Sequence, residues 1–125
     1  MSEATEEKSI ELKDISQLGR IEKTQEVFNG LTVTLQSLSA SHQHKALAAL
    51  PPESLDTLAR FTALQIETLI YATIEINGKK YNDNNRSELR SLYSEMQNKI
   101  LQEIYGLYTE IAKEQNEVIT SLKKT

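Results

Sequence analysis

Residues 55–76 read LDTLARFTALQIETLIYATIEI, the most apolar stretch of this chain. Apolar side chains occupy every side of its helical projection, and Glu67 and Glu75 are the only formal charges after Arg60. A helix that is apolar on all sides has to be buried by other helices. The stretch therefore predicts the central member of an all-α fold, a small antiparallel bundle of three main helices and a short one, with a long C-terminal helix.

The ends of this stretch suggest where the helix starts and stops. Pro51-Pro52 followed by acidic residues is a favourable helix start, and Asn77-Gly78 is a common helix stop. A strand is the alternative, because residues 70–76 also alternate apolar and polar and Asn-Gly is a hairpin turn dipeptide. We favour a helix over residues 52–77, since the following KKYNDNNR provides no second apolar strand.

The N-terminal part shows apolar residues seven apart, at Ile21, Phe28 and Leu35, which predicts a helix over about residues 11–40. Gly30 and the β-branched run at residues 32–34 lower its helix propensity, so we expect a kink near Gly30. A short helix over residues 42–50 follows. The acidic residues 1–9 are expected to form a disordered tail, and residues 10–125 to form one domain.

The C-terminal part predicts one long helix over residues 85–123. Asn85 and Glu88 resemble a capping box, and apolar residues recur every eleven positions. Such a helix would be roughly 60 Å long, far longer than the buried helix that could cover it. It should therefore break at Gly106 or project, and a projecting half would expose an apolar strip that needs a partner. The residues of this predicted partner-binding strip are Tyr105, Tyr108, Ile111, Val118 and Leu122.

The sequence contains no recognisable catalytic or ligand-binding motif. There is no cysteine, and the glutamates of residues 85–123 lack the Glu-x-x-His pairs of bundle metal sites. His42 and His44 are two apart and would point in different directions on a helix. No Gly-x-Ser-x-Gly elbow or phosphate-binding glycine loop is found. We therefore expect no catalytic, cofactor-binding or metal-binding residues.

One alternative is a helical bundle that binds a small molecule or is an enzyme. It would need a pocket lined by inward polar groups around Glu67 and Thr73. We expect Glu67 to face the wettest edge of the bundle instead.

Charge and hydropathy limit the classes of partner. The net charge is −4 and the basic residues are scattered, which disfavours direct nucleic-acid binding. No signal peptide or window long and apolar enough for a membrane span is present, so we expect an intracellular protein in the cytoplasm or nucleus. The sequence thus predicts a non-enzymatic helical adaptor or complex subunit. It would bind a protein partner or a second copy through its C-terminal helix.

Residues 47–100 also contain an ordered set of features found in one protein family. LAALPPE at residues 47–53 precedes an apolar segment with Phe61 and Tyr71, a loop with Gly78, and a second segment with Tyr93 and Met96. This order resembles the helical domain of the nuclear exosome cofactor family, which includes ribosome-biogenesis proteins. The His-Pro of the family's loop and its basic C-terminal tail are missing. The resemblance implies an alternative function, that of an exosome-associated cofactor in an RNA-processing complex.

Overall fold

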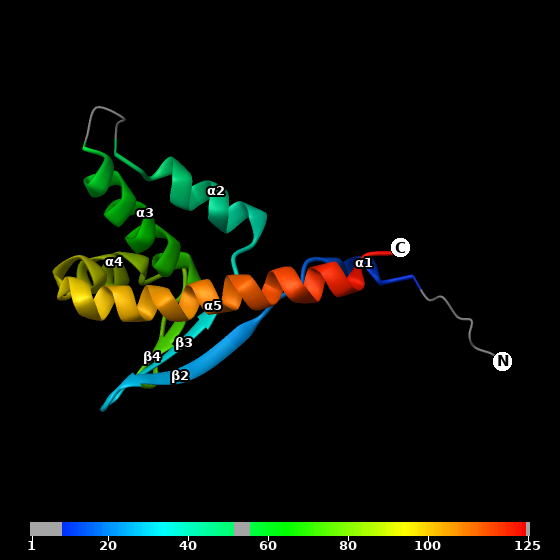
Figure 1. Cartoon of the computed structure of the whole chain (residues 1–125), viewed down its shortest axis with the longest axis horizontal. Helices are drawn as coiled ribbons and strands as arrows, with labels where there is room; N and C mark the ends of the chain where they lie inside the picture. Colours follow the sequence, from blue (N-terminus) through cyan, green and yellow to red (C-terminus); the bar gives the residue numbers. More distant parts are fainter. Residues whose placement is uncertain (1–8, 52–55, 125) are drawn as a thin grey trace.

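A computed structural model describes residues 9–51 and 56–124. The fold is mixed α/β, with helices packed on an antiparallel sheet in the strand order β2-β3-β4-β5 (Figure 1). The prediction of an all-α bundle is therefore wrong, whereas the long C-terminal helix is present. Most of the predicted N-terminal tail and the predicted helix start at Pro52 lie outside the described residues.

The N-terminal segment forms a hairpin instead of the predicted helix. After the short α1 (Leu12–Ile15), strand β2 (Glu22–Phe28) pairs with β3 (Leu31–Gln36) across a two-residue turn at Asn29-Gly30. Gly30 has a φ of 84°, a left-handed conformation that suits this turn and that glycine adopts without strain. The β-branched residues that weaken a helix here favour a strand.

The apolar stretch divides between a helix and a strand. α2 (Ala40–Ala48) begins at Ser39, and α3 (Thr57–Ala72) begins at Asp56, whose carboxylate accepts from two backbone amides of the first turn. α3 then runs directly into β4 (Thr73–Ile76), which turns at Asn77-Gly78 into β5 (Lys79–Lys80). The strand alternative is thus right for residues 73–76. β5 is short and carries two exposed lysines, a combination that blunts a sheet edge.

Asn77 connects this second turn to the first hairpin. Its side-chain Oδ1 accepts from the amide of Thr32 at 2.8 Å, and its Nδ2 donates to the carbonyl of Gly30 at 2.9 Å. The residue itself has a φ of 49°, which asparagine tolerates better than most residues. The two turns of the sheet are therefore fixed to each other by one side chain.

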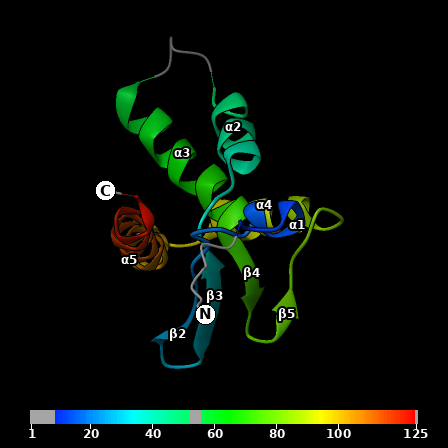
Figure 2. The ribbon, with the colours of Figure 1, turned by 90° about the vertical axis from the view of Figure 1, so that its right-hand side faces the viewer.

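The predicted single helix of residues 85–123 is two helices. α4 (Arg86–Glu95) ends at Met96, and α5 (Asn98–Leu122) begins after Gln97, both linking residues having extended backbone. Gly106 lies inside α5, so the first of the two alternatives for this segment, a break at that glycine, is wrong. The predicted capping box is also wrong, because the Asn85 side chain accepts from the Asn82 amide, at 2.8 Å. Figure 2 shows α5 end-on and apart from α4, and α5 contacts β2 and β3 of the sheet.

The core lies where α3, α4 and α5 meet the inner face of the sheet. Val33 and Leu35 point to this face from β3, and Ile76 lies opposite Val33 on β4. On the helices, the largest fully buried side chains are Leu69, Ile70, Leu89, Tyr93, Ile104 and Ile111. The outer face is more polar: there the hydroxyls of Thr24 and Thr34 lie 2.7 Å apart.

Tyr93 and Thr73 form a buried hydroxyl pair within this core. Thr73 Oγ1 donates to the Leu69 carbonyl at 2.6 Å, so it must accept from the Tyr93 hydroxyl, 2.7 Å away. Burial raises the pKa of Tyr93, which keeps the phenol protonated as a donor.

Replacing Tyr93 by phenylalanine should lower the free energy of unfolding by about 1 kcal/mol, because Thr73 loses its donor. Urea unfolding followed by circular dichroism measures this loss. Tyr81→Phe is the matched control, since the Tyr81 hydroxyl has no side-chain hydrogen bond among the described residues. Equal losses in the two variants would show that the Tyr93–Thr73 bond contributes nothing.

Candidate interaction groove

The predicted partner-binding residues of α5 separate into two kinds in the structure. Ile111 is fully buried in the core, so its prediction as part of an exposed strip is wrong. Tyr105, Tyr108 and Val118 are half-buried, and Leu122 is 52% exposed at the end of the helix. The predicted strip is therefore not one continuous exposed surface.

Tyr105 and Tyr108 instead face a cavity of about 250 Å³ between α2, α3 and α5. Their ring centroids are 5.8 Å apart with the planes tilted by 37°. Burial raises the pKa of both phenols, so both hydroxyls stay neutral and able to donate. We call this cavity the apolar groove, and its lining residues, none of which is charged, are Leu38, Gln43, Ala46, Leu47, Leu64, Thr68, Tyr105 and Tyr108.

Helical spacing brings these residues to the groove. Leu64 and Thr68 are four apart and share one side of α3, and Gln43 and Leu47 do the same on α2. Leu47 is 53% exposed at the rim, and Phe61, one turn before Leu64, is also 53% exposed. The groove therefore opens to the surface beside large apolar side chains.

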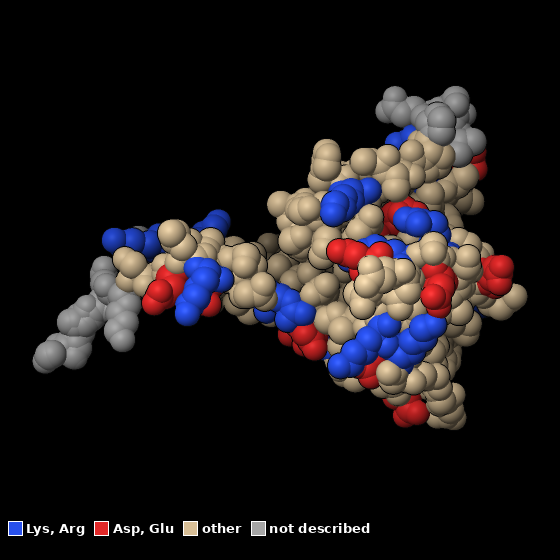
Figure 3. Space-filling model, turned by 180° about the vertical axis from the view of Figure 1, so that it is seen from behind, with Lys and Arg blue, Asp and Glu red and all other residues tan. Residues whose placement is uncertain are grey.

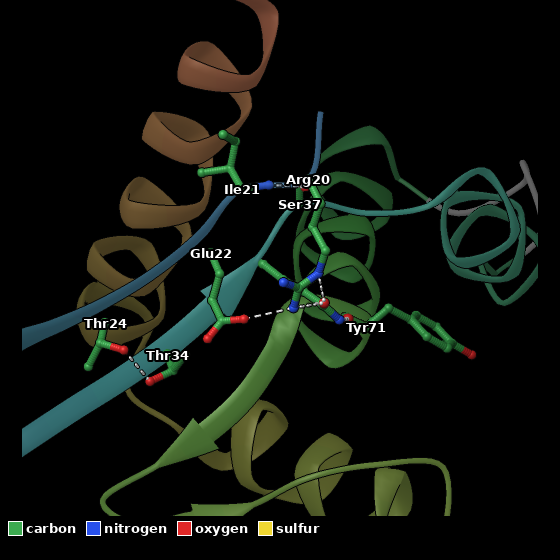
Figure 4. Close-up of polar contacts among 8 residues, drawn as sticks. Arg20, Ile21, Glu22, Thr24, Thr34, Ser37 and Tyr71 are labelled. Carbon is green, nitrogen blue, oxygen red and sulfur yellow. Dashed lines mark hydrogen bonds and ion pairs between the residues drawn. The ribbon is translucent and has the colours of Figure 1, made fainter. Parts of the chain in front are cut away.

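A second, more polar cavity of about 550 Å³ adjoins the apolar groove at Leu38. Arg20 lies on it and bonds to Glu22 at 2.8 Å and to Gln36 at 2.7 Å (Figure 4). The Ser37 hydroxyl, also on this cavity, accepts from the Ile21 amide at 3.0 Å. Arg20 and Gln36 thus bond to each other within the lining, and the Arg20 charge is balanced by Glu22.

The turn that follows α1 contacts the last turns of α5. Gln115 of α5 donates to the Gly19 carbonyl at 3.2 Å, and an added Cβ at Gly19 would be 3.1 Å from Ile119. These contacts place Gly19, in the turn that follows α1, against the last turns of α5, whereas α1 itself lies to one side of α5 (Figure 2). Large apolar side chains are exposed on both segments: Ile10, Leu12, Ile15 and Leu18 before Gly19, and Ile119 and Leu122 at the end of α5.

Glu67 and Thr73, around which the small-molecule alternative places its pocket, both bond to other residues of the same chain. Glu67 is only 8% exposed, so the expectation that it faces the wettest edge is wrong. Its two carboxylate oxygens accept from Arg90 of α4 at 2.9 and 3.0 Å. Since the Thr73 hydroxyl is also bonded, neither side chain has a free group to offer a ligand.

The remaining surface features do not gather into a charged or metal-binding site. Basic and acidic side chains are interspersed over the face seen in Figure 3. Within residues 9–51 and 56–124, no three His, Asp or Glu side chains are grouped closely enough to hold a metal ion. No helix in these ranges combines the length and the hydrophobicity required to cross a membrane.

The sequence identified one wall of the apolar groove and missed the others. The sequence predicts Tyr105 and Tyr108 as partner-binding residues, but it places Leu38 in a helix that does not exist and Leu47 in a short helix without a role. No local pattern in the sequence shows that α2 and α3 pair beside α5.

Comparisons of the chain with protein-family models, curated proteins and solved structures find no match. They neither support nor contradict the resemblance to the nuclear exosome cofactor family.

Proposed function

We propose that this chain is a non-enzymatic adaptor that binds an amphipathic helix of a partner protein in the apolar groove. The observation that carries the proposal is the pair Tyr105 and Tyr108 beside a cavity with no charged lining residue. Tyrosine is enriched where proteins bind each other, since its ring supplies apolar contact area and its hydroxyl a hydrogen bond.

The neutral lining favours one kind of occupant. In a chain with 26% charged residues, three walls without a charge would desolvate a charged side chain without compensating it. Apolar side chains spaced three or four residues apart on a partner helix would lose little hydration free energy on entering the groove. Gln43 and Thr68 could then bond to polar atoms at the edge of that helix.

The volume of the groove sets the scale of the contact. A cavity of about 250 Å³ accommodates one or two side chains rather than a whole helix. The exposed Leu47 and Phe61 would extend the contact beyond the cavity. The expected interface is thus a small anchor pocket surrounded by an apolar rim.

Selection of phage-displayed peptides on the full chain tests the proposal. Enriched peptides should carry apolar residues at helical spacing. Isothermal titration calorimetry should show that Leu47→Asp weakens the best peptide at least about tenfold, the loss expected at a binding hot spot.

Leu12→Asp is the matched control, because Leu12 is 87% exposed but lies on α1, away from the groove. It should leave peptide affinity unchanged. The proposal is overturned if no peptide is enriched, or if the two aspartate variants weaken binding equally. Leu122→Asp measures separately whether the end of α5 contributes to the contact.

A further inference from the structure

His42 holds the first turn of α2 against two other helices. Its imidazole stacks on the Tyr71 ring of α3, with centroids 5.3 Å apart and planes at 27°. The Arg86 guanidinium of α4 lies over the same tyrosine ring, 4.4 Å from its centroid, and pairs with Asp83. One aromatic ring therefore joins α2, α3 and α4.

The surroundings of His42 disfavour its protonated form. Burial lowers its pKa most, the nearby Arg86 and Lys45 lower it further, and Asp83 opposes them. His42 is also the third residue of α2, and the partial positive charge of a helix N-terminus disfavours a cation there. A protonated imidazole stacked on Tyr71 would gain from the ring, but the Arg86 guanidinium over the same ring repels that cation.

α2 also forms a wall of the apolar groove. Gln43, the next residue after His42, and Leu47 both line it, and His42 itself lines the adjoining polar cavity. Displacing the first turn of α2 would therefore change the shape of the groove.

We propose that His42 is a proton-operated latch: neutral, it keeps α2 in place and the groove formed; protonated, it releases the first turn of α2 and weakens partner binding. The groups facing it are Lys45 on α2, Tyr71 on α3, and Asp83 and Arg86 at the start of α4, with Arg20 across the polar cavity. This regulation rests on the proposed function of the groove, but the latch itself is measurable without a partner.

The direction of the effect follows from the lowered pKa. Because the folded protein binds this proton less readily than the unfolded chain, the stability that His42 contributes is complete above the ordinary histidine pKa of about 6.5. It is lost as the pH falls from that value through the lowered pKa of the folded state.

Amide NMR spectra of the full chain between about pH 7.5 and about pH 5 test the latch. In the wild type, the signals of Gln43, Ala46 and Leu47 should move together in one transition with a midpoint below about 6.5. His42→Gln should abolish this transition, and His44→Gln, altering an exposed histidine of the same helix, should retain it. Lys45→Gln removes a nearby positive charge and should raise the midpoint.

The latch is overturned if the wild-type signals do not move, or if His42→Gln shows the same transition. Thermal unfolding at neutral pH checks that His42→Gln is folded.

Peptide binding at the two ends of the pH range then tests the link to function. As the pH is lowered, the affinity of the wild type for the peptide should fall by up to about tenfold per pH unit, while the affinity of His42→Gln stays constant. Peptides that bind the groove equally at both pH values would overturn the regulation and leave the proposed function standing. An NMR transition in a chain that binds no peptide would overturn the proposed function and leave the latch standing.

Discussion

Replacing Leu35 by alanine should lower the free energy of unfolding by about 2–5 kcal/mol. Leu35 is completely buried at the inner face of β3, which is flanked by β2 and β4 and contacted by α5. Removing its side chain leaves a cavity that these elements cannot all close. Because domains of this kind are stable by only about 5–15 kcal/mol, the variant should be near the limit of folding.

Urea unfolding followed by circular dichroism measures this loss. Leu58→Ala is the matched control, since Leu58 is 70% exposed on α3 and the same atoms are removed. Its effect should stay within about 0.5 kcal/mol. Similar losses in the two variants would contradict the placement of β3 at the centre of the core.

Replacing Arg90 by alanine should cost about 2–3 kcal/mol. Glu67 is 8% exposed and both of its oxygens depend on Arg90, so the variant leaves a buried carboxylate without its cation. The cost is below that of a fully buried pair, because 43% of the Arg90 side chain is exposed and water can partly replace it.

A double-mutant cycle separates the pair from its surroundings. Adding Glu67→Gln to Arg90→Ala removes the stranded charge and should restore part of the stability. Lys79→Ala breaks an ion pair with Glu88 whose side chains are both more than half exposed, and it should leave stability nearly unchanged. A cost for Arg90→Ala as small as this control would mean that the Glu67 carboxylate is well solvated.

The first hairpin shows why a spacing pattern misled the prediction of the fold. Apolar residues at positions 21, 28 and 35 satisfy a seven-residue repeat, yet in the structure Phe28 ends one strand, 37% exposed, while Leu35 lies buried in the next. Asn29-Gly30, a strong hairpin signal, stands between them. In a helical interpretation Gly30 and the β-branched residues after it are only weaknesses of a helix, whereas together they are evidence for strands.

The burial predicted for the apolar stretch is right only for its second half, since Leu58 is 70% and Phe61 53% exposed, and its shape is also only partly right. Leu69 and Ile70 are buried on α3 as expected, but the helix passes into β4 without an intervening loop. Residues that alternate in a strand also fit an all-round apolar helix, so only the pairing of β4 with β3 decides between them. No glycine or proline marks the break at Met96 and Gln97, because the break is set by the packing of α4 on α3 and of α5 on the sheet.

Both ends of the described chain lie near the end of α5 that is remote from α4, and this determines how the molecule can be tethered (Figure 1). A linker attached to either end of the described chain would therefore emerge on that side. Immobilisation through either end would leave the rim at Leu47 and Phe61 open to solution. Surface-based binding measurements on the groove should therefore give the same result for both orientations of attachment.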